Sequence, residues 1–407
     1  MIADNINNMP KLLQINVTAN WGSTGKIAEQ IGVCAQANNW ESYIAYGRDS
    51  NPSKNKLIKV GKTCDVLEHY AENLILDNEG GASRIATKKF LMQVDEIRPD
   101  VVHLHNIHDH WLNFKLLFQY LIRKHIPVVW TQHDQWALTG RCAYIPDRCY
   151  KWRTGCHHCK RKGLFTLDRS KRNYSLKKEL LSSVPRLIIV PVSEWLASAF
   201  QESYLKEHEI CVIHNGIDIN VFSPHNTDIH FRYGIAKEKK IVLGVAAVWE
   251  KRKGLNDFYR LARMLPKEDY SIIIVGQLTE KVHDLEDCCQ MVFVSQTQNS
   301  KELAEIYSAA SVFVNPTYQD NYPTTNLEAI SCGTPVVTYR TGGSPESIDN
   351  TTGLVVEQGD ISALYKSVIT LSLGDYKESC REKAIREFNK EKCFEQYIEL
   401  YRSLLAK

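Results

Sequence analysis

Two carboxylate residues, Asp320 and Glu328, stand eight positions apart where a predicted strand gives way to a predicted helix. We expect Asp320 to lie in the loop at the carboxyl end of the strand and Glu328 to face back from the first turns of the helix. The start of that helix offers N–H groups to a phosphate, and each carboxylate accepts hydrogen bonds from sugar hydroxyls. Taken alone, such a pair more often consists of acids that cap a solvated helix.

A short basic turn, 251–253, follows an apolar run in the same half of the chain. It contains Lys251, Arg252 and Lys253, and Gly254 comes next. At the carboxyl edge of a parallel sheet, two or three cations are suited to bind a diphosphate.

A glycine-rich segment, 20–26, follows the first predicted strand and leads into a helix. It matches neither the dinucleotide-binding fingerprint nor the P-loop, so it gives no support to a dehydrogenase or a P-loop kinase. Two interpretations of this segment are about equally good. It is an anion site formed by backbone N–H groups, or it is simply a tight turn.

Four cysteines fall within eighteen residues and end in a Cys-x-x-Cys pair. Four thiolates satisfy tetrahedral zinc, which favours a structural zinc site slightly over free thiols. The proposed ligands are Cys142, Cys149, Cys156 and Cys159.

The segment 151–178 carries ten Lys or Arg residues and one acid, Asp168. Two interpretations explain this basic segment equally well. It is a solvated helix face, or it is a surface that docks on anionic lipid or on a diphosphate-linked lipid acceptor. In the second interpretation the interleaved apolar residues lie at the lipid interface; they are Trp152, Leu164, Phe165 and Tyr174.

Short continuous apolar runs alternate with amphipathic stretches along the chain, which predicts parallel sheets covered by helices on both faces. The predicted strands are 12–17, 42–46, 101–105, 127–131, 187–192, 240–248, 271–275, 292–294, 312–315 and 335–338. The predicted helices are 26–37, 66–76, 87–97, 114–123, 255–265, 301–309 and 325–331. The fold class is therefore α/β, with two doubly wound, Rossmann-like domains joined near the turn-forming residues 214–218.

The composition excludes several classes of protein. The chain has 407 residues and a net charge of +3, too nearly neutral for a general nucleic-acid binder, so we expect no nucleic-acid partner. No apolar stretch reaches the ~18 residues that span a bilayer, and the start lacks the features of a secretory signal. With twelve cysteines and no export signal, a cytoplasmic location is expected.

Three motifs in order along the chain resemble glycosyltransferase family 4: the sequence 214–218, the turn 252–254, and the array from Asp320 to Glu328 with its continuation to 335. The resemblance extends from residue 12 to 407 and is greatest to bacterial exopolysaccharide and colanic-acid-type transferases. It implies the GT-B fold, in which two Rossmann-like domains face each other across a cleft.

On this basis the domains are expected as follows: 1–10 a disordered extension, 11–213 an acceptor-binding domain with a Cys-rich basic insert at 141–178, 214–224 a linker, 225–391 a nucleotide-sugar-binding domain, and 392–407 a helix that crosses back to the first domain.

The resemblance also implies roles for individual residues. Lys253 and Arg252 would hold the donor diphosphate, Glu328 the ribose hydroxyls, and Asp320 the donor sugar. Backbone N–H groups from Tyr322 to Thr325 would lie near the sugar and phosphate. The expected nucleotide-sugar-binding residues in this array also include Asn321, Tyr322, Thr324 and Thr325.

In the first domain, the resemblance implies that Gly25 closes over the diphosphate and that His133 lies beside the donor sugar and acceptor. A lone histidine is more often a structural residue. With His133 included because of the resemblance, the expected catalytic set is His133, Arg252, Lys253 and Asp320.

The activity implied is retaining transfer of a sugar from a nucleotide-diphosphate sugar to a saccharide or lipid-linked saccharide, in the synthesis of cell-surface polysaccharide. No cofactor is required for this chemistry. The enzyme is expected in the cytoplasm, with peripheral contact at the inner face of the membrane through 151–178. The alternatives are a nucleotide-sugar hydrolase or phosphorylase, and a non-catalytic protein that binds nucleotide sugars or RNA.

Overall fold

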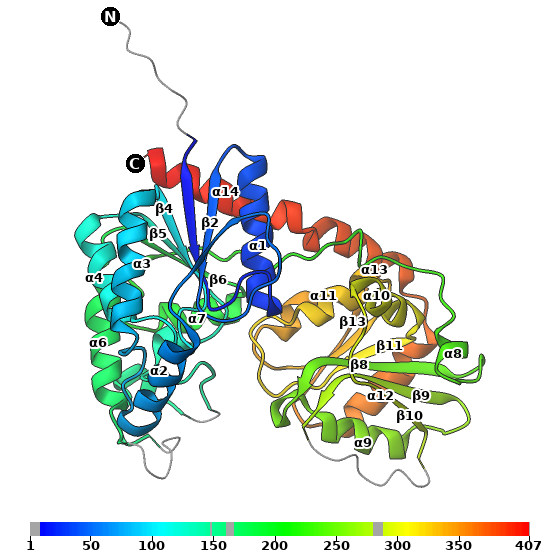
Figure 1. The fold of residues 1–407 in the computed structure, drawn as a ribbon. Coiled ribbons are helices and arrows are strands. Elements are labelled where there is room, and N and C mark those ends of the chain that lie inside the picture. Colours follow the sequence, from blue (N-terminus) through cyan, green and yellow to red (C-terminus); the bar gives the residue numbers. More distant parts are fainter. Residues whose placement is uncertain (1–8, 147–148, 160–166, 280–287, 407) are drawn as a thin grey trace, which may run out of the picture. The chain divides into compact units, whose positions relative to one another are not determined.

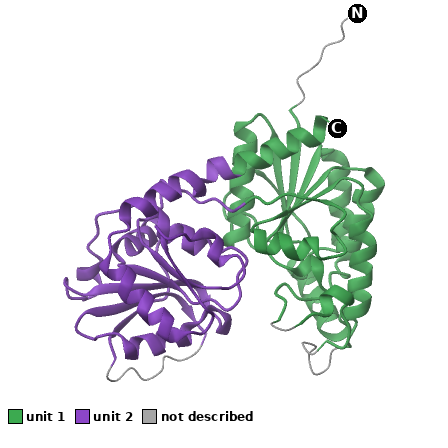
Figure 2. Ribbon diagram, turned by 180° about the vertical axis from the view of Figure 1, so that it is seen from behind, with its two compact units in different colours: residues 1–213, 394–407 green, residues 214–393 purple. Residues whose placement is uncertain are grey.

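The computed structural model describes residues 9–146, 149–159, 167–279 and 288–406, in two compact units. Unit 1 comprises Met1–Ile213 and Phe394–Lys407, and unit 2 comprises His214–Cys393 (Figure 2). The stretch 214–224, expected as a linker, thus forms the first part of unit 2. Residues 1–8 of the expected disordered extension lie outside the described residues.

Unit 1 contains a seven-stranded parallel sheet with the order β3-β2-β1-β4-β5-β6-β7. The order reverses between β1 and β4, so the loops after these two strands diverge at the carboxyl edge. The strands are β1 Lys11–Ile15, β2 Glu41–Tyr46, β3 Lys56–Lys59, β4 Val101–Leu104, β5 Val128–Gln132, β6 Leu187–Pro191 and β7 Glu209–Ile210.

Helices cover both faces of this sheet (Figure 1). They are α1 Gly22–Ala37, α2 Thr63–Leu76, α3 Arg84–Ile97, α4 Phe114–Lys124, α5 Lys151–Thr154, α6 Ser170–Ser182 and α7 Glu194–Gln201, with a 3₁₀ turn at Trp136–Leu138. Within the described parts of the chain, no helix is long and apolar enough to cross a bilayer.

The last helix, α14 (Lys390–Ala406), completes the core of unit 1. Its Tyr397 and Tyr401 are buried, and the Tyr401 hydroxyl lies 2.6 Å from Nδ1 of His103 on β4. The Thr131 hydroxyl on β5 lies 2.7 Å from Nε2 of the same histidine and donates to the Tyr397 hydroxyl at 2.9 Å. Because these groups are fully buried, the helix satisfies polar atoms that the sheet alone would leave without partners.

Unit 2 contains a six-stranded parallel sheet with the order β10-β9-β8-β11-β12-β13. The strands are β8 Lys240–Trp249, β9 Tyr270–Leu278, β10 Gln290–Val294, β11 Val312–Asn315, β12 Val336–Tyr339 and β13 Gly353–Val356. The helices are α8 Ile229–Arg232, α9 Leu255–Met264, α10 Ser300–Ala309, α11 Thr324–Ser331, α12 Ile361–Leu373 and α13 Lys377–Lys383. Short 3₁₀ turns lie at Lys251–Lys253 and Ser344–Ser347, and a π-helical turn at Ala384–Phe388 precedes α14.

The structure confirms two doubly wound, parallel α/β domains. The edge strands β3, β7 and β13 were not predicted, and the predicted helices did not include α6, α7 or α12. The residues of β3 are mostly exposed, so they lack the continuous apolar run by which the buried strands were recognised. Helix α14 begins at Lys390, two residues before the expected start.

Candidate functional site

In unit 2 the order of strands reverses between β8 and β11, where a doubly wound sheet binds its ligand. The loops that follow these two strands are in direct contact. Gly254, at the end of the first loop, has a φ of +77°, and a Cβ there would lie 2.1 Å from the carbonyl oxygen of Pro316 in the second loop. The contact therefore requires glycine, which fixes the basic turn against the loop that carries Asp320.

Lys253 and Asp320 form an ion pair across these two loops, with Nζ 2.6 Å from Oδ2. Their side chains are partly buried, at 22% and 16% exposure. The other carboxylate oxygen of Asp320 accepts the N–H of Asn321 at 2.9 Å. The ammonium has three donors and the carboxylate four acceptor positions, so both groups keep capacity for a ligand.

Arg252 helps to hold the second loop in place. Its guanidinium donates to the carbonyl of Gln319 at 3.2 Å, and its own carbonyl accepts the N–H of Tyr318 at 2.7 Å. It also pairs with Glu250 at 3.0 Å. The structure thus brings together the two cations and Asp320, as expected from their positions in the sequence.

The N-terminus of α11 opens beside this pair. The helix begins with Thr324 and Thr325, which are half-buried, and no side chain caps it. Asn326 is fully buried and anchors the first turn: its Oδ1 accepts from Asn315 on β11 at 2.8 Å, and its Nδ2 donates to the Ser347 hydroxyl at 3.2 Å. Because the helix start is fixed, its free N–H groups are preorganised for an anion.

Glu328, one turn further along α11, is held by a residue that the sequence did not single out. The Tyr307 hydroxyl of α10 donates to Glu328 Oε2 at 3.0 Å. Burial and the neighbouring carboxylate raise the pKa of Tyr307 well above its usual range, so the phenol remains a donor. No sequence signal marks Tyr307, because its position in a regular helical pattern is that of an ordinary core residue.

If Glu328 binds the ribose of a nucleotide-sugar donor, as the resemblance implies, replacing Tyr307 with phenylalanine should raise the KM for that donor about three- to tenfold and change kcat less than twofold. The reason is that one hydrogen bond of about 1 kcal/mol positions Glu328 away from the reacting atoms. Steady-state kinetics with varied donor would measure both constants. Tyr339→Phe is the matched control, since its buried hydroxyl donates to Asp257 instead. A fall in kcat with unchanged KM would contradict this role.

Tyr322 was expected near the ligand through its backbone. Its side chain is buried and packs on His214, with ring centroids 4.7 Å apart, and His214 Nε2 lies 3.2 Å from Glu346 Oε2. The packing of Tyr322 on His214 links two of the motifs on which the resemblance rests, the sequence 214–218 and the array from Asp320 to Glu328. The side chain of Tyr322 therefore has a packing role within unit 2.

The resemblance implied that Gly25 lies in a loop of the first domain that closes over the diphosphate. In the structure Gly25 lies in the first turn of α1, so the expected loop position was wrong. The helix begins at Gly22, four residues earlier than predicted. A Cβ on Gly25 would lie 2.6 Å from the Thr18 hydroxyl, so the close approach of the helix to residue 18 requires glycine here.

His133 follows β5 and ends a row of histidines along the sheet. Its Nε2 lies 3.2 Å from His105 Nδ1, and His105 in turn contacts Gln14 and stacks near His103. Burial lowers the pKa of His133 to about 4, which makes the ring neutral at physiological pH. It can therefore accept or donate one hydrogen bond, but it supplies no positive charge.

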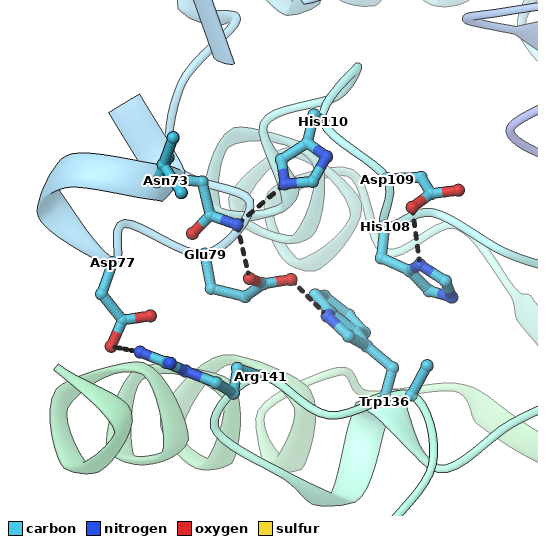
Figure 3. Close-up of a pocket in the computed structure, with 10 residues that line it drawn as sticks. Asn73, Asp77, Glu79, His108, Asp109, His110, Trp136 and Arg141 are labelled. Carbon is cyan, nitrogen blue, oxygen red and sulfur yellow. Dashed lines mark hydrogen bonds and ion pairs between the residues drawn. The ribbon is translucent and has the colours of Figure 1, made fainter. Parts of the chain in front are cut away.

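A pocket of about 330 Å³ lies among the loops of unit 1 (Figure 3). Its walls come from the end of α2, the loop after β4 and the loop after β5. The lining residues are Asn73, Leu74, Asp77, Glu79, His108, Asp109, His110, Trp136, Arg141 and Ala143. Sequence reasoning missed this pocket, because its residues come from three separate segments that only the fold brings together.

Carboxylates dominate the pocket. Glu79 accepts from the Trp136 indole at 2.7 Å and from Asn73 at 3.1 Å, and Asp77 pairs with Arg141 (Figure 3). The Oδ1 atom of Asn73 and the Nε atom of Arg141 are buried without a hydrogen-bond partner in the structure. Unpaired polar atoms beside a cavity are suited to bind a polar ligand.

An ion pair between His108 and Asp134 supports the wall of this pocket, with Nε2 2.7 Å from Oδ2. Burial opposes the charged form of His108, but the interaction with Asp134 outweighs it and raises the pKa of the histidine. The second oxygen of Asp134 accepts the N–H of Trp136 at 2.8 Å. The charge of His108 is thus balanced within the wall, which leaves the pocket acidic overall.

The four cysteines proposed as zinc ligands are all described and all half-buried. Among the described residues, no three His, Cys, Asp or Glu side chains are arranged to hold a metal ion. Cys156 Sγ accepts the N–H of Gly140 at 3.3 Å, and burial raises the pKa of its thiol. Zinc at Cys142, Cys149, Cys156 and Cys159 stays a prediction.

Metal analysis of the purified protein should find about one equivalent of zinc if these thiols bind it, and a Cys142→Ser/Cys159→Ser variant should lose it. Cys64→Ser, which removes an exposed thiol from α2, is the control. Less than about a tenth of an equivalent of zinc in the unmodified protein would contradict the hypothesis of a zinc site.

Within the basic segment 151–178, the structure contradicts part of the expected lipid interface. Trp152 and Tyr174 are buried in unit 1, each with 7% exposure, because their rings fill the core under α5 and α6. Leu164 and Phe165 lie outside the described residues. Exposed cations on α6 include Lys171, Arg172 and Lys178.

Two family profiles match the chain in succession. The profile described as "Glycosyltransferase Family 4" matches residues 28–221, and that described as "Glycosyl transferases group 1" matches residues 225–399. The chain belongs to the group 1 glycosyltransferases of family 4. The family and its named relatives are transferases, which confirms the expectation of a transferase enzyme.

Curated relatives of this group 1 glycosyltransferase include enzymes of polysaccharide synthesis. It is 23% identical to a "Putative colanic acid biosynthesis glycosyl transferase WcaC" from Escherichia coli over 75% of this chain and 77% of the relative. It is 27% identical to a "Capsular polysaccharide biosynthesis glycosyltransferase CapM" from Staphylococcus aureus, over 48% of this chain and only 53% of the relative.

Solved structures share the fold of this glycosyltransferase over nearly its whole length. A sucrose-phosphate synthase from Thermosynechococcus elongatus aligns with a TM-score of 0.72 at 18% identity, covering 98% of this chain and 99% of that one. Anabaena HepE in complex with UDP aligns with a TM-score of 0.66 at 15% identity, covering 97% and 100%. The fold is GT-B, as the resemblance implied.

Proposed function

We propose that this glycosyltransferase moves a sugar from a nucleotide-diphosphate sugar to a saccharide or lipid-linked saccharide with retention of configuration. The observation that carries the proposal is the Lys253–Asp320 pair at the switch point of the unit 2 sheet, beside the open start of α11. Cations, free N–H groups and two carboxylates together suit the charged and the hydroxylated parts of such a donor.

Each part of the donor is assigned to a different group of the site. The diphosphate would be held by Lys253, Arg252 and the N–H groups of Thr324 and Thr325. Glu328 would accept hydrogen bonds from the ribose. Asp320, fixed by the N–H of Asn321, would accept hydrogen bonds from the sugar. HepE, which shares the fold, was solved in complex with UDP, and this supports a nucleotide as part of the donor.

In the transfer step, the bond between the anomeric carbon and the diphosphate oxygen breaks, and a bond to the acceptor oxygen forms on the same face. The acceptor proton passes to the leaving diphosphate. This step needs no nucleophile from the protein, because Lys253, Arg252 and the helix N-terminus stabilise the charge on the leaving group. His133 would lie beside the sugar as a neutral ring.

The pocket of unit 1 would receive the acceptor. Its carboxylates, with unpaired atoms on Asn73 and Arg141, suit the hydroxyls of a saccharide. The names of the WcaC and CapM relatives support an acceptor from cell-surface polysaccharide, and the name of a Campylobacter jejuni relative with 29% identity, a diphospho-undecaprenol N-acetylgalactosaminyltransferase, supports a lipid-linked one. The proposal includes peripheral association of the enzyme with the inner face of the membrane.

Three measurements test the proposal. Thermal shift with a panel of UDP-, GDP- and ADP-sugars should identify one donor that raises Tm by several degrees. Release of nucleoside diphosphate from that donor should then depend on an added saccharide or polyprenyl-diphosphate saccharide. NMR of the product would show the configuration at the anomeric carbon. Release that is unaffected by any acceptor would favour a hydrolase or phosphorylase instead.

A further inference from the structure

A chain of hydrogen bonds leads from the core of unit 1 to His133. Its members are Gln14 on β1, His105 directly after β4, and His133 directly after β5. Gln14 and His105 are 0% and 1% exposed. Among residues 131–140, His133 alone is partly exposed. His133 is therefore the member of the chain that a ligand can reach.

The inner end of the chain has a fixed direction. The Nε2 amide of Gln14 donates to the carbonyl oxygen of Ala28 on α1 at 2.8 Å. Because a carbonyl oxygen only accepts, the reverse orientation of the amide would place two acceptors against each other. The Oε1 atom of Gln14 must then face His105, where it lies 3.1 Å from Nε2.

This orientation determines where His105 carries its proton. Since Oε1 of Gln14 accepts, Nε2 of His105 must donate. Burial lowers the pKa of His105 well below its usual range, so the ring is neutral and has one proton for its two nitrogens. Its Nδ1 atom therefore has no proton and can only accept.

The same reasoning extends to His133. Its Nε2 lies 3.2 Å from Nδ1 of His105. The two rings are nearly parallel, at 17°, and their centroids are 5.5 Å apart, so they meet edge to edge, as a hydrogen bond in the ring plane requires. Nε2 of His133 must donate here. Asp134 favours the charged form of His133, but burial outweighs it and lowers the pKa to about 4. Nδ1 of this neutral ring is then an acceptor.

We propose that Gln14 and His105 are positioning residues that fix the tautomer of His133, so that its Nδ1 accepts a hydrogen bond from a sugar hydroxyl of the substrate. The inference rests on the proposed function, which places His133 beside the sugar. Because Gln14 and His105 are buried, they act through His133 and do not touch the substrate themselves.

The tautomer is measured directly by NMR. Long-range ¹H–¹⁵N spectra of the full chain, labelled with ¹⁵N-histidine, separate protonated from unprotonated ring nitrogens at neutral pH. The chain has 14 histidines, so His133→Phe and His105→Phe identify the two signals of interest. His133 should carry its proton on Nε2. A proton on Nδ1 in the unmodified protein would overturn the inference.

Replacing Gln14 with leucine should reverse the tautomer of His133. His105 then has no acceptor for its Nε2–H, and a buried donor without a partner is unfavourable, so its proton moves to Nδ1 and donates to His133. The proton of His133 moves to Nδ1 in turn. Gln132→Leu is the matched control, since Gln132 is buried beside His133 but its Nε2 makes no hydrogen bond within the described residues.

An unchanged tautomer in Gln14→Leu would overturn the inference. If this variant does not fold, His105→Phe gives the same information. It removes the acceptor of His133 Nε2, so both nitrogens of His133 should show intermediate shifts. A fixed Nε2 tautomer in folded His105→Phe would show that the hydrogen-bond chain is not what holds the proton there.

Kinetics test whether the tautomer matters for transfer. Gln14→Leu should lower kcat/KM for the donor about five- to tenfold, the effect of one hydrogen bond. In a His133→Phe background the same substitution should change it less than about twofold, because Gln14 acts only through His133. An equal loss in both backgrounds would assign Gln14 a packing role and overturn the inference.

His133→Phe by itself separates this inference from the proposed function. Normal transfer by this variant would overturn the sugar contact of His133, both here and in the proposed function. The spectrum is recorded without turnover, so the fixed tautomer is confirmed or contradicted whether or not a donor has been identified.

Discussion

Replacing Lys253 with alanine should lower sugar transfer about a hundred- to a thousandfold while the protein stays folded. The lysine lies on the basic turn at the switch point, with its ammonium 2.6 Å from Asp320, and it would face the diphosphate as negative charge develops on the leaving group. Removing one such group costs a few kcal/mol of transition-state stabilisation. The side chain is partly exposed, so its loss leaves no cavity in the core.

Lys251→Ala is the matched control for this variant. Lys251 belongs to the same short turn but is exposed, and its loss removes an equal charge from the same loop. Initial rates with saturating donor and acceptor, together with circular dichroism of both variants, would make the comparison. If Lys253→Ala turns over at nearly the normal rate, the donor site is not where we place it.

Replacing Lys177 with methionine should remove a marked pH dependence of the stability of unit 1. Lys177 on α6 is fully buried, donates to the carbonyl oxygens of Trp136 and Thr139 at 2.9 and 3.0 Å, and lies over the Trp136 ring. Burial lowers the pKa of this lysine to about 7. In the unfolded chain a lysine titrates near pH ~10.4.

The direction of the effect follows from proton uptake. Between pH 7 and 10 the unfolded chain binds a proton at Lys177 that the folded protein does not, so the free energy of unfolding rises with pH. The slope approaches about 1.4 kcal/mol per pH unit, and the full effect is on the order of 4 kcal/mol. The variant lacks this contribution, so its stability relative to the unmodified protein falls as the pH rises.

Hydrogen exchange of the β5 amides between pH 7 and 9 would report the unfolding of unit 1 separately from unit 2. Lys178→Met, the exposed neighbour on the same helix, should retain the slope of the unmodified protein. Parallel pH profiles for Lys177→Met and the unmodified protein would show that the buried amine does not titrate in this range.

The sequence predicted those features of the fold and of the candidate site that depend on residues close together along the chain. The buried strands were recognised from their continuous apolar runs, and the basic turn and the Asp320–Glu328 array lie in loops directly after such strands. Loops that follow parallel strands lie at the same edge of the sheet, so the basic turn and Asp320 could be expected on one edge, whereas the ion pair between Lys253 and Asp320 was not predicted.

Features that depend on tertiary packing could not be predicted. The contact of Tyr307 with Glu328 joins two helices whose separation in sequence reveals nothing about their facing sides. The pocket in unit 1 is assembled from three distant segments. Likewise Trp152 and Tyr174 looked like surface aromatics because they stand among basic residues, but they are buried since α5 and α6 turn those residues toward the core.

Helix α14 has a consequence for how the chain is made. Unit 2 is one continuous segment, and the last part of unit 1 follows it, carrying the tyrosines that satisfy His103 and Thr131. A ribosome releases the chain from its N-terminus, and domains generally fold as units as they emerge. The first unit to be synthesised is therefore the last to be completed, because its core stays open until residues 394–406 leave the ribosome. A nascent chain stalled before that point would carry a finished unit 2 and an unfinished unit 1.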